Sequence, residues 1–219
     1  GSSAPTSNTP GAFVRTATAI YPNGEREDVK ILFKVQPSKP QIDANSVIAK
    51  GGLSNQQVIV RNVQNNVDVK LYQANGSVIP NTTSVIANGT ATITVQGTLP
   101  TDNIYAKSSI TTNNLTYAKR TNNDVSDTTE NVTVTSENSD QVNVTVAMEA
   151  KNGGIKLVKG IDFNFNNFNN FISNAPANSR FAWAQSPDTW KGNIGQSNKT
   201  VNVTLPNNQG TRTVDIPVM

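Results

Sequence analysis

The chain contains no cysteine and no histidine among its 219 residues. Without these side chains it cannot assemble a Ser-His-Asp or Cys-His nucleophilic site, and zinc sites built from imidazole or thiolate ligands are excluded. The lack of cysteine also excludes the inter-sheet disulfide of antibody-type domains. This indicates an exported protein of a Gram-positive bacterium, although cytosolic proteins also lack disulfides.

Large side chains and charges are scarce as well. Aromatic residues make up 6% of the chain, charged residues 15% and hydrophobic residues 35%, which favours small modules with thin cores over one large core. No apolar run approaches the roughly 20 residues of a membrane span, so no membrane insertion is expected. The net charge of +3 comes without a lysine or arginine cluster, so nucleic acid is not an expected partner.

The acidic residues do not predict catalysis. None of the five glutamates stands in an apolar stretch that would raise a catalytic pKa, and no glycine-rich phosphate loop is visible. Asp43-Ala44-Asn45 and Asp162-Phe163-Asn164 offer alternating oxygen atoms that could suit Ca²⁺, but turn and cap duty is the favoured interpretation. We therefore predict a non-enzyme without catalytic residues, metal or cofactor. Whether a Lys–Asn isopeptide crosslink forms stays open at this point.

The sequence does show a regular alternation of apolar and polar residues. Apolar residues recur with a period of two along many short segments, which is the pattern of strands with one buried face. Asn-Gly pairs, such as Asn75-Gly76 and Asn88-Gly89, stand between these segments and favour tight hairpin turns. Short strands separated by regular turns predict an all-β chain of tandem antiparallel immunoglobulin-like β-sandwiches. The 31 asparagines suit turns and exposed strand faces.

Two polar or proline-containing stretches divide the chain. The first is residues 36–40, whose prolines cannot continue a central strand, and the second is the polar stretch 119–130, which is predicted to be a linker. We therefore expect a tail and β-hairpin at 1–38, one domain at 39–122 and a second β-sandwich with an aromatic-rich insertion at 123–219. The hairpin is either the end of a preceding module or a docking hairpin, because an isolated hairpin is marginal in water.

An internal repeat links the first and last segments. Residues 17–24 (ATAIYPNG) are followed by Val29-Lys30-Ile31, and residues 201–208 (VNVTLPNN) are followed by Val214-Asp215-Ile216. Each copy reads as strand, Pro-Asn turn and strand, with one residue more in the second loop. Such self-similarity is typical of an array of modules.

Residues 39–122 resemble the bacterial immunoglobulin-like repeats of Gram-positive surface proteins. The resemblance rests on the hairpins VKLYQANG at 69–76 and ANGTATITV at 87–95. The flanking hairpins YPNG and LPNNQGTRTVDIPV are similar to module ends in giant staphylococcal cell-wall-anchored proteins that bind extracellular matrix. The resemblance implies an extracellular, wall-attached adhesin whose anchor lies outside these residues. The helical repeats credited with matrix binding in that family are not visible here.

The oddest stretch is aromatic. Four phenylalanines lie among asparagines at 162–173, where a short helix is predicted, and two tryptophans follow. One hypothesis is a ligand groove in which Trp183, Trp190, Asp188 and Phe168 contact a glycan or a protein. The favoured alternative is that these aromatic residues fill the core of the last module.

The sequence thus predicts a structural and adhesive module of a cell-surface protein. It would act as a spacer between neighbouring modules of the same chain and bind a host extracellular matrix protein or a cell-wall glycan. The alternative is a dedicated carbohydrate- or protein-binding module that uses the aromatic cluster of 163–190.

Overall fold

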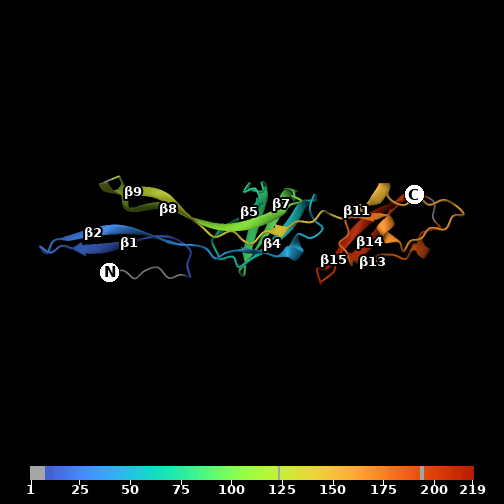
Figure 1. Cartoon of the computed structure of the whole chain (residues 1–219), viewed down its shortest axis with the longest axis horizontal. Helices are drawn as coiled ribbons and strands as arrows, with labels where there is room; N and C mark the ends of the chain where they lie inside the picture. Colours follow the sequence, from blue (N-terminus) through green and yellow to red (C-terminus); the bar gives the residue numbers. More distant parts are fainter. Residues whose placement is uncertain (1–7, 123, 193–194) are drawn as a thin grey trace. The chain divides into compact units, whose positions relative to one another are not determined.

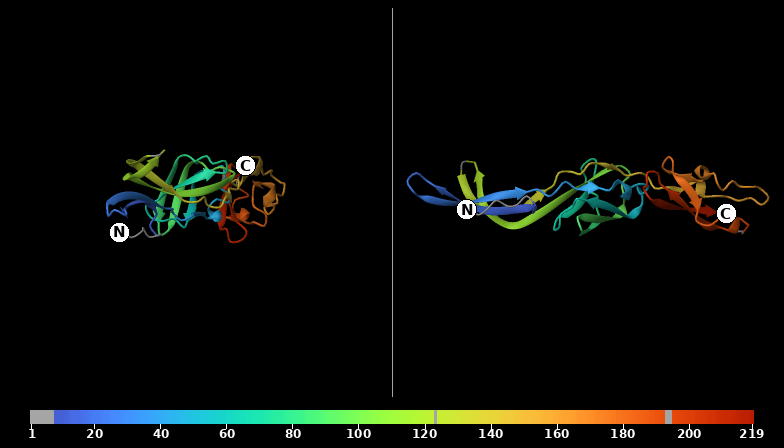
Figure 2. Two further views of the ribbon diagram at one scale, coloured as in Figure 1. Left: turned by 60° about the vertical axis from the view of Figure 1, so that its left-hand side comes forward. Right: turned by 90° about the horizontal axis from the view of Figure 1, so that it is seen from below.

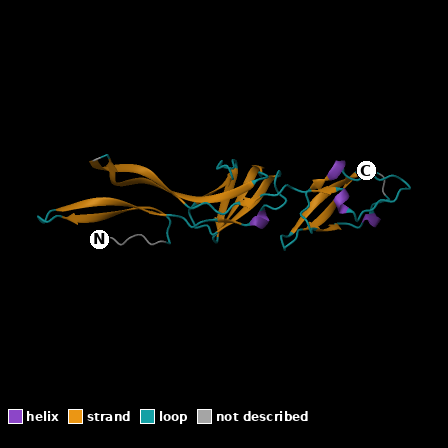
Figure 3. Cartoon of the chain, in the orientation of Figure 1, coloured by secondary structure: helices purple, strands orange, loops and turns teal. Residues whose placement is uncertain are grey.

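The computed structural model describes residues 8–122, 124–192 and 195–219, and strands dominate it (Figures 1 and 3). The predicted all-β class is confirmed, with 53% of residues in strands and 6% in helical turns. The helix expected near 162–173 is a single 3-10 turn, η3 (Phe168–Asn170). Similar turns are η1 (Ala44–Ser46), η2 (Lys151–Gly153) and η4 (Pro187–Thr189). Within the described ranges, no helix has the length and hydropathy of a bilayer-crossing segment.

Asparagine sets the turns of this fold. Thirteen non-glycine residues of the described chain have a positive φ, and all of them except Ala49 are asparagine. The short amide side chain tolerates the left-handed region better than other side chains, because it can bond its own local backbone. Asn75, whose own φ is not positive, makes such a local bond, because its side-chain oxygen accepts from the Ser77 N–H at 2.9 Å across Gly76. The asparagine richness is therefore structural.

The chain divides into two compact units that alternate along the sequence. The first unit contains the chain up to Asp43, together with Gln57–Thr94 and Ile104–Gln141. The second unit contains Ala44–Gln56, Val95–Asn103 and Val142–Met219. Each unit is described separately below.

Two sheets supply most of the first unit. One has the strand order β3-β4-β7-β6, formed by β3 (Gln41–Ile42), β4 (Ser54–Arg61), β7 (Thr90–Thr98) and β6 (Thr82–Ala87). In the other, β8 (Asn103–Thr121) pairs with β5 (Asp68–Gln73) and with β9 (Asp124–Thr135), whereas the short strand β10 (Val142–Asn143) belongs to the second unit. The alternating apolar residues are buried as the sequence predicts, including Val58, Val60, Leu71, Ile93 and Ile104.

The first unit also contains a two-stranded sheet of β1 (Gly11–Ile20) and β2 (Arg26–Val35), which pair in register over ten residues each. This hairpin lies beside the C-terminal part of β8 and beside β9 (Figures 1 and 2). Ala12, with Val14 and Leu32, packs into a small apolar cluster with Tyr117 and two valines of β9. An ion pair of 2.6 Å between Lys30 Nζ and Asp127 lies on the same side. The hairpin is thus docked rather than isolated.

The linker hypothesis for residues 119–130 is wrong. Residues 119–121 belong to β8 and residues 124–130 to β9, and Lys119 pairs with Ser126 and Arg120 with Val125. Residue 123 lies outside the described residues. A polar stretch can form strands here because most of its side chains reach solvent and threonine is a good strand former. The division of the chain into segments 1–38, 39–122 and 123–219 stays a prediction.

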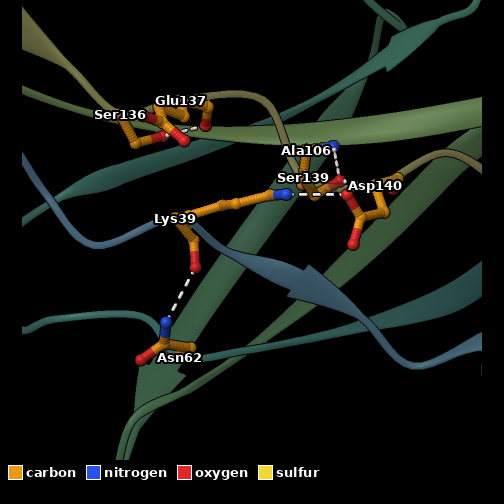
Figure 4. Close-up of polar contacts among 7 residues, drawn as sticks. All are labelled: Lys39, Asn62, Ala106, Ser136, Glu137, Ser139 and Asp140. Atoms are coloured by element: carbon orange, nitrogen blue, oxygen red, sulfur yellow. Dashed lines mark hydrogen bonds and ion pairs between the residues drawn. The ribbon is translucent and has the colours of Figure 1, made fainter.

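Two serines attach the chain after β9 to β8 (Figure 4). The Ser136 and Ser139 hydroxyls accept from the buried backbone N–H groups of Ser108 and Ala106 at 3.0 and 2.8 Å. The backbone N–H groups of the same two serines donate in return to the carbonyls of Ser108 and Ala106. The two serine hydroxyls therefore take the place of backbone carbonyls as hydrogen-bond acceptors for β8, where the chain after β9 leaves regular strand geometry.

Lys39 joins this region to the proline-containing stretch before β3. Its ammonium group lies 2.7 Å from the Asp140 carboxylate, and its carbonyl accepts from the Asn62 side chain at 2.7 Å (Figure 4). The hydrogen bond with Asp140 raises the pKa of Lys39 above its ordinary value. Both side chains are well exposed, so the pair positions the chain more than it stabilises it.

Glu130, Tyr117 and Lys119 form a hydrogen-bonded group on the β8–β9 hairpin. Glu130 accepts from the Tyr117 hydroxyl and from Lys119 Nζ, the latter at 3.0 Å. The Tyr117 hydrogen bond, followed by that of Lys119, lowers the pKa of Glu130 below its ordinary 4.5. The hydrogen bond to Glu130 raises the pKa of Tyr117 above 10.0 and that of Lys119 above 10.5.

The second unit contains a three-stranded sheet of order β13-β14-β15 and a two-stranded sheet of β11 and β12. Their bounds are β13 (Arg180–Trp183), β14 (Ser197–Thr204), β15 (Thr211–Val218), β11 (Glu149–Ala150) and β12 (Ile172–Ser173). Residues after η2 run along β15, with Ile155 N–H donating to the Pro217 carbonyl at 2.7 Å. Only glycine fits at position 154, because its φ is +104° and a Cβ there would lie 2.0 Å from the Pro217 oxygen.

We expect Ser139→Ala to lower the free energy of unfolding by about 1–3 kcal/mol, since it leaves the Ala106 N–H buried without its acceptor. Chemical denaturation measures this. Ser126→Ala, on the exposed turn end of the hairpin, is the matched control and should change the free energy by less than about 0.5 kcal/mol. Equal effects of the two changes would contradict the bonding role of Ser139.

Acid stability should depend on Glu130. Its pKa is lower in the folded than in the unfolded chain, so it stabilises the fold above about pH 4.5, and this is lost as the pH falls through the lowered pKa. Tyr117 and Lys119 have raised pKa values, so their contribution is complete below about pH 10.0 and is lost as the pH rises through the raised values. Calorimetric Tm values below pH 4.5 should therefore fall less steeply in Glu130→Gln than in the wild type. Glu149→Gln is the control, and a decline reduced equally in both variants would refute the assignment.

Candidate ligand-binding groove in the second unit

An aromatic layer covers one face of the β13-β14-β15 sheet. Phe171 and Trp190, which are 3% and 6% exposed, lie in the same apolar cluster as Val201, Val203 and Ile216. The other aromatic residues of 163–190 are half-buried and pack against this cluster: Phe163, Phe165, Phe168, Phe181 and Trp183. The sheet itself carries mostly valines, so these rings supply the bulk of the core, as the favoured interpretation of the sequence expects.

Trp183 lies at the centre of the layer. Its ring is 5.6 Å from Phe171, 5.7 Å from Phe168 and 5.4 Å from Trp190, between ring centroids. Both indole N–H groups bond within the unit: Trp183 donates to the Phe165 carbonyl at 3.0 Å, and Trp190 to the Gln185 carbonyl at 3.3 Å. The two tryptophans thus hold the Asn-rich segment and η4 on the sheet.

The four residues predicted to contact a ligand are only partly brought together. Phe168, Trp183 and Trp190 share the aromatic layer, whereas Asp188 is exposed on η4 and pairs with Lys191 at 2.5 Å. The hydrogen bond to Asp188 raises the pKa of Lys191 above its ordinary value. A ligand role for these four residues stays a prediction.

The second unit has an open groove of about 770 Å³ beside this layer. Its apolar walls include Leu157, Phe163, Phe165, Trp190 and Val218, so Trp190 is the member of the predicted set that lines it. Three lysines line it too, Lys159, Lys191 and Lys199, against one acidic side chain, Asp162. The groove is therefore apolar with a cationic rim.

Lys199 gives the rim its defined geometry. Its ammonium group lies 5.3 Å from the centroid of the Trp190 ring, which is cation–π distance. This residue was missed by sequence reasoning, although a signal exists: it continues the inward alternation of Val201 and Val203, and lysine is unusual in such a series. An acidic ligand with an apolar surface would match both parts of the groove.

The acidic groups considered for Ca²⁺ have other contacts. Asp43 forms an ion pair of 2.7 Å with Arg61, and Asp162 lines the groove. Across residues 8–122, 124–192 and 195–219, no three acidic side chains lie together in a way that could hold a metal ion.

The whole chain is similar to segments of much longer staphylococcal proteins. It is 42% identical over 221 residues to the extracellular matrix-binding protein EbhB of Staphylococcus aureus strain Newman and to the extracellular matrix-binding protein ebh of strain NCTC 8325. The match covers 100% of this chain but only 3% and 2% of those relatives, and 6% of EbhB from strain N315. No family model matches the chain. The resemblance predicted from the hairpin motifs is confirmed.

We expect Trp190→Ala to lower the free energy of unfolding by about 3–5 kcal/mol, because it empties a buried ring position between the sheet and the Asn-rich segment. Ile161→Ala, at a 68% exposed position in the same unit, should have an effect below about 0.5 kcal/mol. Denaturant titration followed by near-ultraviolet circular dichroism compares the two. A Trp190→Ala chain as stable as the wild type would mean that the ring does not contribute to the core.

Proposed function

Because its full length is similar to one segment of the staphylococcal extracellular matrix-binding proteins, we propose that this chain is a non-enzymatic adhesive module of a bacterial surface protein. The observation that carries the proposal is the 42% identity along the entire chain, which includes all the sheets of the first unit and the aromatic layer of the second. The module is extracellular, attached to the cell wall by parts of a longer protein, and acts as a spacer that holds binding regions away from the cell.

The internal bonding of the first unit supports the spacer role. Ser136 and Ser139 bond β8 on both backbone and side-chain atoms, and Lys39 is held by Asp140. These contacts fasten the stretches at 36–40 and 136–141, where regular strands end, so the chain is connected where it would otherwise bend. Polar, weakly charged outer faces keep such an array soluble.

A second candidate function is direct binding of a matrix protein at the groove of the second unit. Apolar walls beside Trp190 and a rim of Lys159 and Lys199 favour an acidic polypeptide segment that also carries apolar side chains. A carbohydrate could use the same walls, but Lys159 and Lys199 beside Asp162 leave the rim positive even with Lys191 paired to Asp188, and this favours an anionic partner.

Binding is tested with immobilised fibronectin and fibrinogen as probes. We expect retention that weakens as salt rises, and a loss of about tenfold in affinity for the double change Lys159→Glu and Lys199→Glu, since both reverse charge at the rim. Lys156→Glu lies on the same segment but outside the groove lining and should leave affinity unchanged.

Absence of retention at roughly 100 μM on both surfaces would remove the binding function, because such an affinity is too weak for adhesion by a single site. Equal losses in the double variant and in Lys156→Glu would keep binding but exclude the groove as its site. The spacer role would stand in both cases.

A further inference from the structure

The hairpins β1–β2 and β14–β15 share one register. Ala17 pairs with Val29 in the first, and Val201 pairs with Val214 in the second. These four residues are also equivalent in the internal sequence repeat, which aligns Pro22 with Pro206. Directly paired residues of an antiparallel hairpin point to the same face. The face with Ala17 and Val29 is therefore equivalent to the face with Val201 and Val214.

The two equivalent faces differ in how far other residues bury them. In β14–β15 this face is the floor of the aromatic core, and Ile216 is fully buried. Its equivalent in β1–β2, Ile31, is 39% exposed. At the turn, Leu205 is 3% exposed, whereas its equivalent Tyr21 is 45% exposed.

The exposed face nevertheless has the composition of a buried one. Phe13 pairs with Phe33, and Ile31 and Val29 continue the same side of β2. Arg15 also lies on this face, where it pairs with Ile31 as its equivalent Lys199 pairs with Ile216. In the described chain, the apolar cluster that holds this hairpin is built from Ala12, with Val14 and Leu32, which lie on the opposite face. On this face Ile31 and Ala17 are exposed and Val29 and Phe33 are half-buried, so the apolar strip has no complete apolar layer over it in the described chain.

We propose that this face of β1–β2 is the docking surface for an aromatic, Asn-rich polypeptide segment of the kind that residues 155–190 form over β14–β15. The argument for this occupant is the shared register, because a segment that fits Val201, Val214 and Ile216 finds apolar side chains at the same positions of β1–β2. The size of the side chains agrees: Ala17 and Ala19 replace the larger Val201 and Val203, and Phe33 replaces the smaller Val218. The two hairpins would then end two modules of the same kind.

The test supplies the segment in the same chain. A second copy of residues 142–191 is fused to the N-terminal side of Asn8 in a chain of residues 8–219. Residues 8–12 then connect this copy to β1–β2, as the equally long stretch 192–196 connects residue 191 to β14. Amide hydrogen exchange is measured over residues 27–33 in the fused and the unfused chain. We expect exchange at least about tenfold slower in the fusion, since a covered hairpin opens less often.

Two changes on the docking face should abolish that protection, namely Ile31→Asp and the milder Ala17→Glu at an exposed position. Ile20→Asp, on the opposite face of the same hairpin and 65% exposed, is the matched control and should keep the protection. The same variants in the unfused chain, followed by circular dichroism, show that the hairpin itself still forms.

Unchanged exchange in the fusion, or protection that survives both face variants, would overturn the proposal. Concentration-dependent dimerisation of the unfused chain that Ile31→Asp abolishes would assign the face to a second copy instead, and would also overturn it. None of these outcomes depends on retention by matrix proteins, so failure here leaves the adhesive function untouched.

Discussion

The sheets of the described chain are thin, so their stability depends on another segment that covers their apolar faces. Aromatic residues are only 6% of the chain, and they are concentrated where valine-rich strands need bulk. In the second unit, Phe171 and Trp190 fill that role over Val201, Val203 and Ile216. Burial of a large ring removes more apolar area from water than burial of a valine, so a few well-placed rings can replace a thick core.

Much of this could be predicted from local pattern. Alternation along 67–71 and 91–95 fixed which residues are buried, because a strand has a strict period of two. The Asn-Gly turns followed from the need for a positive φ. Many single asparagines with positive φ, such as Asn62 and Asn114, were not predicted individually, because asparagine also occurs at ordinary strand positions of this chain, such as Asn131 and Asn202. The composition indicated that asparagines would occupy turns, but it did not indicate which asparagines would do so.

Other features depend on contacts between distant residues and carry little local signal. Residues 119–121 and 124–130 lack apolar alternation, yet they pair with each other as the end of β8 and the beginning of β9. The groove combines residues near 157–165 with Lys199 and Val218, which are brought together by backbone hydrogen bonds along β15 and by the packing of the aromatic layer. Sequence reasoning found Trp190 by its type, and it missed the lysines because single lysines are usually solvated surface residues.

The two related hairpins also show how modules of one type can differ in their surroundings. On the polar side of β14–β15 lie Thr200 and Asp215, joined at 2.7 Å, and Asn198, which corresponds to Val14 of β1–β2. The β1–β2 hairpin instead has Val14 and Leu32 on that side, half-buried against β8–β9. Of these two hairpins, β1–β2 therefore is the one that carries apolar side chains on both faces. A ribbon of this kind is costly to expose, since each face needs its own cover. It gains stability when layers from two sides enclose it, and this would connect consecutive modules through packing as well as through the backbone.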